Sequence, residues 1–266
     1  MGAPTSTLDG WRQHPFAAHG QSHDCYEKGE GPGVVVIPEI PGITPEVLGL
    51  ADHLVASGFR VVIPSLFGTP GREESLGYVL GTVARVCISA EMRAFARNAH
   101  RPVTDYLRAL AADLAGRTPG TGVGVIGMCF TGGFALATAV EPTVNAPVMA
   151  EPSVPFPVSA SRRTDPGMSP DELRTVVGRT HTDGLCVLGL RFSQDAAAPA
   201  ARFETLRHSL GDAFEVIELD SAPGNPDGYS TRAHSVLTSE VRTDPPNSAA
   251  TARDRVVAFL SERLSA

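Results

Sequence analysis

Cys129 lies in the pattern that most clearly could carry chemistry. The apolar run Val123–Gly127 leads into Met-Cys-Phe-Thr, and Gly132, Gly133 and an Ala/Leu-rich segment follow. A strand, a sharp turn and a helix in this order present a nucleophile at the turn. A thiol at this position lies beside a helix N-terminus, whose free N–H groups favour negative charge. The pattern therefore predicts a reactive thiolate with amide donors close by for an oxyanion.

A cysteine nucleophile needs a general base, and the base needs an acid that orients it. Asp195 follows the apolar run Leu185–Leu190, and His234 follows the later run Phe214–Leu219. Nucleophile, acid and histidine occur in this chain order in α/β-hydrolases. We therefore predict a triad of Cys129, His234 and Asp195. The weaker alternatives are Asp183, which precedes its strand, for the acid, and His181 and His208 for the base.

A further carboxylate, Glu39, comes directly after the apolar run Gly33–Pro38. A charged residue at the end of a buried strand faces the rim of a pocket, so we expect Glu39 to belong to the site. The backbone N–H groups of Ile40 and Phe130 would form the oxyanion hole. Prolines on both sides of the Glu-Ile pair stiffen this loop.

The elements that must position these residues alternate along the chain. Short apolar runs, near-continuous rather than alternating, predict strands buried on both faces of a parallel sheet. They are 33–38, 59–64, 123–127, 146–150, 185–190 and 214–219. Helical patterns over 45–57, 103–114, 132–140, 199–210 and 249–264 lie between or after them. This alternation predicts an α/β fold with a mostly parallel sheet and helices on both faces.

We expect residues 1–30 to form an N-terminal arm or edge hairpin and residues 31–266 to form one domain. Two stretches, 68–101 and 151–184, are longer than ordinary connections, so both are expected to frame the pocket. Residues 68–101 are the candidate lid or insert.

Composition narrows the classes of function. The 266 residues carry 22 Lys and Arg against 29 Asp and Glu, a formal net charge of −7. Binding to a nucleic-acid backbone requires an excess of positive charge, so nucleic acid is not expected as a partner. No run reaches membrane-spanning length and no apolar leader precedes the domain, so we expect a cytoplasmic protein without membrane contact. The four cysteines have no metal-binding spacing, and no metal or cofactor is expected.

Taken together, these residues resemble the dienelactone hydrolase family of α/β-hydrolases, from about residue 30 to the C-terminus. The resemblance rests on Val-Ile-Pro-Glu39-Ile-Pro-Gly, Gly-Phe-Arg-Val-Val-Ile-Pro-Ser-Leu-Phe67, Gly-Met-Cys129-Phe-Thr-Gly-Gly, Gln-Asp195 and Ala-His234-Ser. It implies an α/β-hydrolase fold and a Cys-His-Asp triad with Glu39 as an auxiliary carboxylate. In such enzymes substrate binding frees the glutamate from an arginine, and the glutamate then takes the thiol proton. His234 would activate the water that releases the acyl group.

The family also uses arginines to hold the glutamate and the substrate carboxylate. Arg85 is the best positional match for one of them, and Arg93 is the second choice. The other family arginine closely follows the histidine, whereas here Ser-Val-Leu-Thr follow His234 and the next arginine is Arg242. This departure predicts a different, larger or more apolar substrate.

The sequence thus predicts a metal-independent hydrolase that cleaves a lactone or small ester through an acyl-cysteine, as a monomer or homodimer. The alternative is a non-hydrolytic enzyme of the same fold, a cyclase or isomerase of a biosynthetic pathway. A third reading is a binding or regulatory protein that has lost turnover. The complete set of nucleophile, base and acid argues against that third reading.

Overall fold

The computed structural model describes residues 2–75, 77–82 and 102–265. Within these ranges eight strands form one sheet in the order β1-β2-β4-β3-β5-β6-β7-β8. The six strands from β3 to β8 run parallel to one another. Their bounds are Gly33–Ile37 (β3), Arg60–Pro64 (β4), Val123–Met128 (β5), Val144–Ala150 (β6), Val187–Phe192 (β7) and Phe214–Leu219 (β8). All six coincide with the predicted apolar runs to within a few residues.

The central strands are apolar at nearly every position because both faces of the sheet are covered. In β3, Val34 and Val36 join the hydrophobic cluster on one face. Val35 and Ile37 join the cluster on the other face. Successive side chains of β3 thus point to opposite faces of the sheet, although the sequence shows only a continuous apolar run.

An antiparallel hairpin extends the sheet at one edge. It consists of β1 (Arg12–Ala18) and β2 (Gln21–Lys28), and β2 pairs with β4. His19 and Gly20 at the tip have φ of 50° and 75°, the left-handed backbone that a tight two-residue hairpin turn requires. Most of the first 30 residues, expected as an arm or edge hairpin, therefore continue the sheet of the main domain.

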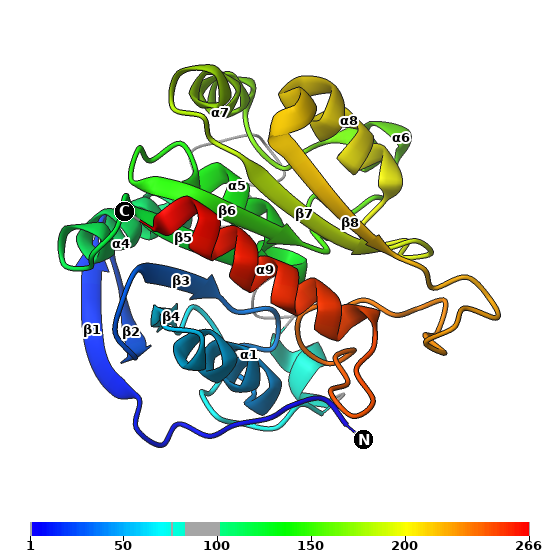
Figure 1. Ribbon diagram of the computed structural model, residues 1–266, viewed down its shortest axis with the longest axis horizontal. Coiled ribbons are helices and arrows are strands. Elements are labelled where there is room, and N and C mark those ends of the chain that lie inside the picture. Colours follow the sequence, from blue (N-terminus) through cyan, green and yellow to red (C-terminus); the bar gives the residue numbers. More distant parts are fainter. Residues whose placement is uncertain (1, 76, 83–101, 266) are drawn as a thin grey trace.

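Helices cover both faces of the sheet (Figure 1). Helices α1 (Pro45–Ala56) and α9 (Ser248–Leu264) pack on the face that includes Val34 and Val36. The opposite face carries α4 (Pro102–Gly116), α5 (Gly132–Thr138), α7 (Pro170–Thr182) and α8 (Ala200–Leu210). This is the α/β-hydrolase fold that the sequence predicts. None of the described helices has the length and apolar character that crossing a membrane requires.

The two long connections differ from the prediction in part. Residues 151–184, expected as a loop, contain the short helix α6 (Ala160–Thr164) and all of α7. Helix α7 begins with a capping box between Ser169 and Glu172 and with Pro170 at its first turn. In the candidate lid, 77–82 are helical, while 83–101 lie outside the described residues.

The parallel strands all deliver their carboxyl ends to one edge of the sheet, where ligands bind in open α/β sheets. Glu39 follows β3, Cys129 follows β5, Glu151 follows β6 and Asp195 follows β7. His234 lies in the long segment between β8 and α9. Five chemically capable side chains are thus brought to a common edge from distant parts of the chain.

Candidate active site

Cys129 occupies a strained turn at the end of β5. Its φ is +51°, in the left-handed region that residues with a Cβ seldom adopt. Such a conformation costs of order 1–3 kcal/mol and persists only where the surroundings enforce it. Gly127 permits the tight turn, because a Cβ there would lie 2.3 Å from the carbonyl oxygen of Thr131. The sequence pattern Gly-x-Cys therefore folds as a sharp turn between a strand and a helix, with Cys129 at the turn.

Thr131 fastens this elbow to the neighbouring strand. Its hydroxyl donates to the carbonyl oxygen of Ile37, at 3.0 Å, and accepts the N–H of Met128, at 3.1 Å. The side chain is fully buried. Nucleophile elbows often have glycine at this position, but here the hydroxyl ties the elbow to the end of β3, which carries Glu39.

The segment after β6 supports the elbow from the other side. Ser153 donates its N–H to the carbonyl oxygen of Cys129 at 3.0 Å, and its Oγ lies 3.6 Å from the Cys129 Sγ. Gly132 permits this approach, because a Cβ there would lie 2.7 Å from the Ala150 oxygen and 2.8 Å from the Pro152 Cα. The buried Arg202 holds the same segment by donating to backbone carbonyls, among them those of Pro152, Pro155 and Asp165.

The partly exposed His234 and the buried Asp195 form a pair beside the thiol. The Nδ1 atom of His234 lies 2.7 Å from Oδ2 of Asp195. The other carboxylate oxygen, Oδ1, accepts the N–H of Ala197 at 2.8 Å, which fixes the orientation of the carboxylate. Burial lowers the pKa of His234, but hydrogen bonds with Asp195 and Cys129 and the charge of Cys129 outweigh it and raise that pKa above its ordinary value. The pair can therefore accept and hold a proton from the thiol.

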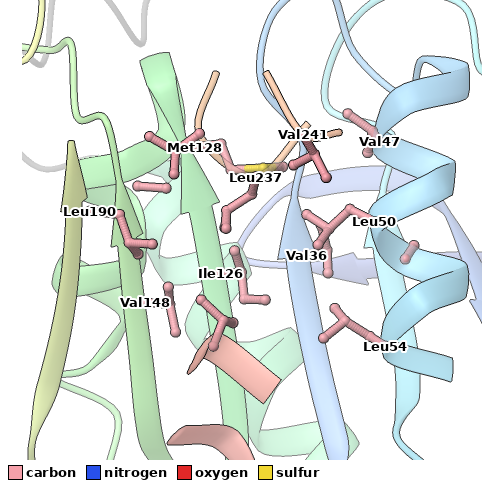
Figure 2. Close-up of a cluster of buried hydrophobic side chains, with 14 of the residues drawn as sticks. Val36, Val47, Leu50, Leu54, Ile126, Met128, Val148, Leu190, Leu237 and Val241 are labelled. Atoms are coloured by element: carbon pink, nitrogen blue, oxygen red, sulfur yellow. The ribbon is translucent and has the colours of Figure 1, made fainter. Parts of the chain in front are cut away.

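The loop that carries His234 is anchored in the hydrophobic core. Val236, Leu237 and Val241 are fully buried. Figure 2 shows Leu237 and Val241 among side chains of the sheet and of α1. A histidine on an otherwise irregular segment thus has a fixed position.

Glu39 contacts the loop that carries His234. Its Oε2 accepts a hydrogen bond from the hydroxyl of Ser235 at 2.7 Å, and its Oε1 accepts one from Thr238. These two residues belong to the Ser-Val-Leu-Thr segment after His234, where the family resemblance led us to look for an arginine. Arg85 and Arg93, the predicted partners, lie outside the described residues.

The predicted oxyanion donors lie at adjacent strand ends. Strands β3 and β5 are paired in parallel, with Ile37 opposite Gly127. Ile40 follows Glu39 beyond β3, and Phe130 follows Cys129 beyond β5. Their amides therefore come from neighbouring strands at the edge that holds the thiol.

The alternative candidates for the acid and for the base lie on the protein surface. Asp183 is exposed at the end of α7 and forms an ion pair with Arg179 at 2.8 Å. His181 is exposed on α7 and His208 is exposed on α8. They have the environment of ordinary surface residues.

Sequence reasoning missed two residues, Glu151 and Ser153. Glu151 is fully buried at the end of β6 and interacts electrostatically with His234, Glu39 and Cys129. The sequence did offer an indication, since Glu151 follows an apolar strand just as Glu39 does. In the described part of the chain, no three His, Cys, Asp or Glu side chains gather as a metal site.

Comparison with known proteins agrees with this geometry. A family model described as the dienelactone hydrolase family matches residues 22–263. This chain belongs to the dienelactone hydrolase family. No match was found among curated proteins.

Solved structures of similar fold include several dienelactone hydrolases. One, from Klebsiella pneumoniae, is 19% identical and has a TM-score of 0.61, with 95% of this chain and 98% of that chain covered. Another, from Anabaena variabilis, is 14% identical with a TM-score of 0.58, covering 96% and 99%. A third is a dienelactone hydrolase-like promiscuous phosphotriesterase from metagenomic libraries, at 16% identity and a TM-score of 0.62, covering 96% and 98%. At these identities the likeness concerns the fold.

Proposed function

We propose that this family member hydrolyses a lactone or small ester through a covalent acyl-cysteine on Cys129. The observation that carries the proposal is the strained turn at φ +51°, with Cys129 beside the hydrogen-bonded pair of His234 and Asp195. Strain of this kind at a residue of nucleophilic chemistry is typical of functional sites. Membership of the dienelactone hydrolase family supports the same reaction class.

In the acylation half-reaction, His234 takes the thiol proton and Sγ forms a bond to the carbonyl carbon of the substrate. The carbonyl oxygen becomes an oxyanion, which the N–H groups of Ile40 and Phe130 stabilise. Collapse of this intermediate breaks the bond to the alkoxy oxygen, which takes the proton from His234. In a lactone this new alcohol stays attached to the acyl chain.

In the second half-reaction, water attacks the thioester and His234 takes its proton. Collapse breaks the carbon–sulfur bond, the carboxylic acid leaves, and the proton returns to sulfur. Asp195 keeps the imidazole in the tautomer and orientation that both steps need. Glu39 acts in this scheme as an auxiliary carboxylate that orients the histidine loop through Ser235 and Thr238.

The test is turnover of activated esters and simple enol lactones by wild type and Cys129→Ala. We expect hydrolysis by wild type, loss in the variant, and one atom of ¹⁸O from labelled water in the acid product. Product without ¹⁸O would indicate a cyclase or isomerase, and full activity in Cys129→Ala would exclude the acyl-cysteine.

A further inference from the structure

Glu151 is a buried carboxyl group that the scheme above does not use. It follows β6 directly, its side chain has no exposed surface, and its φ of +34° is left-handed, like that of Cys129. Its Oε2 accepts the N–H of Val236 at 3.3 Å. Its Oε1 is buried without a hydrogen-bond partner among the residues that the structure describes. An ionised carboxylate in such surroundings would be poorly solvated.

Glu39, the other glutamate near Cys129, has different hydrogen bonds from Glu151. Each of its oxygens accepts a hydrogen bond from a hydroxyl group, one from Ser235 and one from Thr238. Two hydroxyl donors stabilise the charged form of a carboxyl group. Glu151 has a single, long bond from a backbone amide. The two carboxyl groups of one site therefore differ in how well the protein compensates a negative charge on them.

The largest electrostatic effect on Glu151, its burial, also favours the neutral form of the carboxyl group. Burial raises the pKa of Glu151 well above its ordinary value, and the nearby negative charges of Glu39 and Cys129 add to this effect. The positive charge of His234 and the hydrogen bond from the Val236 N–H oppose it. These groups face Glu151 from the end of β3, from the elbow after β5 and from the histidine loop. Hydrogen bonds with Asp195 and Cys129 raise the pKa of the imidazole, and an ionised Glu151 would add to that effect.

The contact with Val236 connects Glu151 to the reaction. Val236 lies two residues beyond His234, so Glu151 holds the histidine loop from β6 while Glu39 holds it from β3. A neutral carboxyl group accepts this N–H through its carbonyl oxygen. Ionisation would pass the proton to solvent and add a negative charge beside the thiolate and the oxyanion, and like charges at close range repel strongly in a buried site.

We propose that Glu151 is a positioning residue that works only in its protonated form: neutral, it holds the His234 loop, and ionised, its charge opposes thiolate formation and acylation at Cys129. The effect on acylation rests on the proposed acyl-cysteine function. The protonation of Glu151 does not depend on it, so the two can be tested separately.

The kinetic test compares Glu151→Gln with Glu39→Gln. The amide in Glu151→Gln keeps the oxygen that accepts from Val236 and cannot ionise. We expect kcat/KM at neutral pH within about threefold of wild type, and an alkaline fall of kcat/KM shifted to higher pH. For Glu39→Gln we expect kcat/KM to fall at least about tenfold. The amide nitrogen of glutamine cannot accept a hydrogen bond, so one of the two hydroxyl groups, of Ser235 or Thr238, loses its acceptor. The control is Glu204→Gln on the exposed surface of α8, which should match wild type.

The direct test is the infrared difference spectrum between wild type and Glu151→Gln. We expect the carbonyl band of a protonated carboxylic acid in wild type at neutral pH, and its loss as pH rises through the alkaline limb. Absence of this band would overturn the proposal and leave the proposed function intact. An unshifted alkaline limb in Glu151→Gln, or a loss above tenfold at neutral pH, would overturn the positioning role. If the amide variant does not fold, Glu151→Met removes the same charge and serves for the infrared band and for the position of the alkaline limb.

Discussion

His234 and Asp195 meet at 2.7 Å between Nδ1 and Oδ2 although strand β8 and helix α8 separate them in the chain. The carboxylate is held by a second hydrogen bond, from the Ala197 N–H to Oδ1. The imidazole is held by the buried residues that follow it in its loop. Both partners are therefore fixed before substrate arrives, which is what a base that must act on one atom requires.

Asp195→Asn should separate catalysis from folding. Asparagine keeps the oxygen that accepts from Ala197, so the loop should retain its shape. Its amide donates where the carboxylate accepts, and thereby favours the wrong tautomer of His234. We expect kcat/KM for an activated ester to fall by about 10²- to 10⁴-fold. The melting temperature, measured in parallel, should change little, and a fall in activity that only matched a loss of folded protein would contradict this role.

Two adjacent glycines offer a matched pair. A Cβ on Gly132 would meet backbone atoms at 2.7 and 2.8 Å, whereas on Gly133 the nearest atom lies at 3.6 Å. Gly132→Ala should push the elbow away from the segment after β6, with a cost of about 1–3 kcal/mol in the free energy of unfolding and a lower kcat. Gly133→Ala should be neutral or slightly stabilising, because alanine favours the helix. Urea unfolding measures both, and equal effects would refute the explanation.

Arg202 should be replaceable by neither lysine nor an apolar residue. Its guanidinium is fully buried and donates to carbonyl groups of the segment that carries Ser153. A lysine ammonium lacks the planar fork that reaches several carbonyls at once. Arg202→Lys should lower the free energy of unfolding by about 1–3 kcal/mol per carbonyl left unsatisfied. The prediction would be wrong if denaturant unfolding placed the variant within experimental error of wild type.

The pH dependence of stability should reveal the bond between His234 and Asp195. Because the pKa of His234 is raised in the folded state, the stabilisation is complete below about pH 6.5, the ordinary value for histidine, and is lost as pH rises toward the raised value. The free energy of unfolding should fall more steeply above pH 6.5 in wild type than in His234→Gln. Parallel curves would contradict the prediction.

Much of the fold could be predicted from the sequence because its strands are buried on both faces and therefore read as apolar runs. The elbow could be predicted because its constraints are local, and Gly127 and Cys129 are close in sequence. Helix α7 was missed although the capping box between Ser169 and Glu172 is visible in the sequence. Its apolar residues Leu173, Val176 and Val177 have helical spacing but are few, because most of the helix is polar.

The contacts of Glu39 could not be predicted from the sequence. Its hydroxyl partners lie 196 and 199 residues away, on a segment without regular secondary structure. Only the path of that loop through the core brings Ser235 and Thr238 to the end of β3. The role of Glu151 depends likewise on what surrounds it, since burial rather than residue type favours its neutral form.

Mass spectrometry of the acid-quenched enzyme during turnover of an activated ester tests the central claim most directly. The account predicts that the peptide containing Cys129 gains the mass of the acyl group, and that Cys129→Ala shows neither the adduct nor turnover. Turnover by wild type with an unmodified Cys129 peptide, together with undiminished turnover in Cys129→Ala, would contradict it.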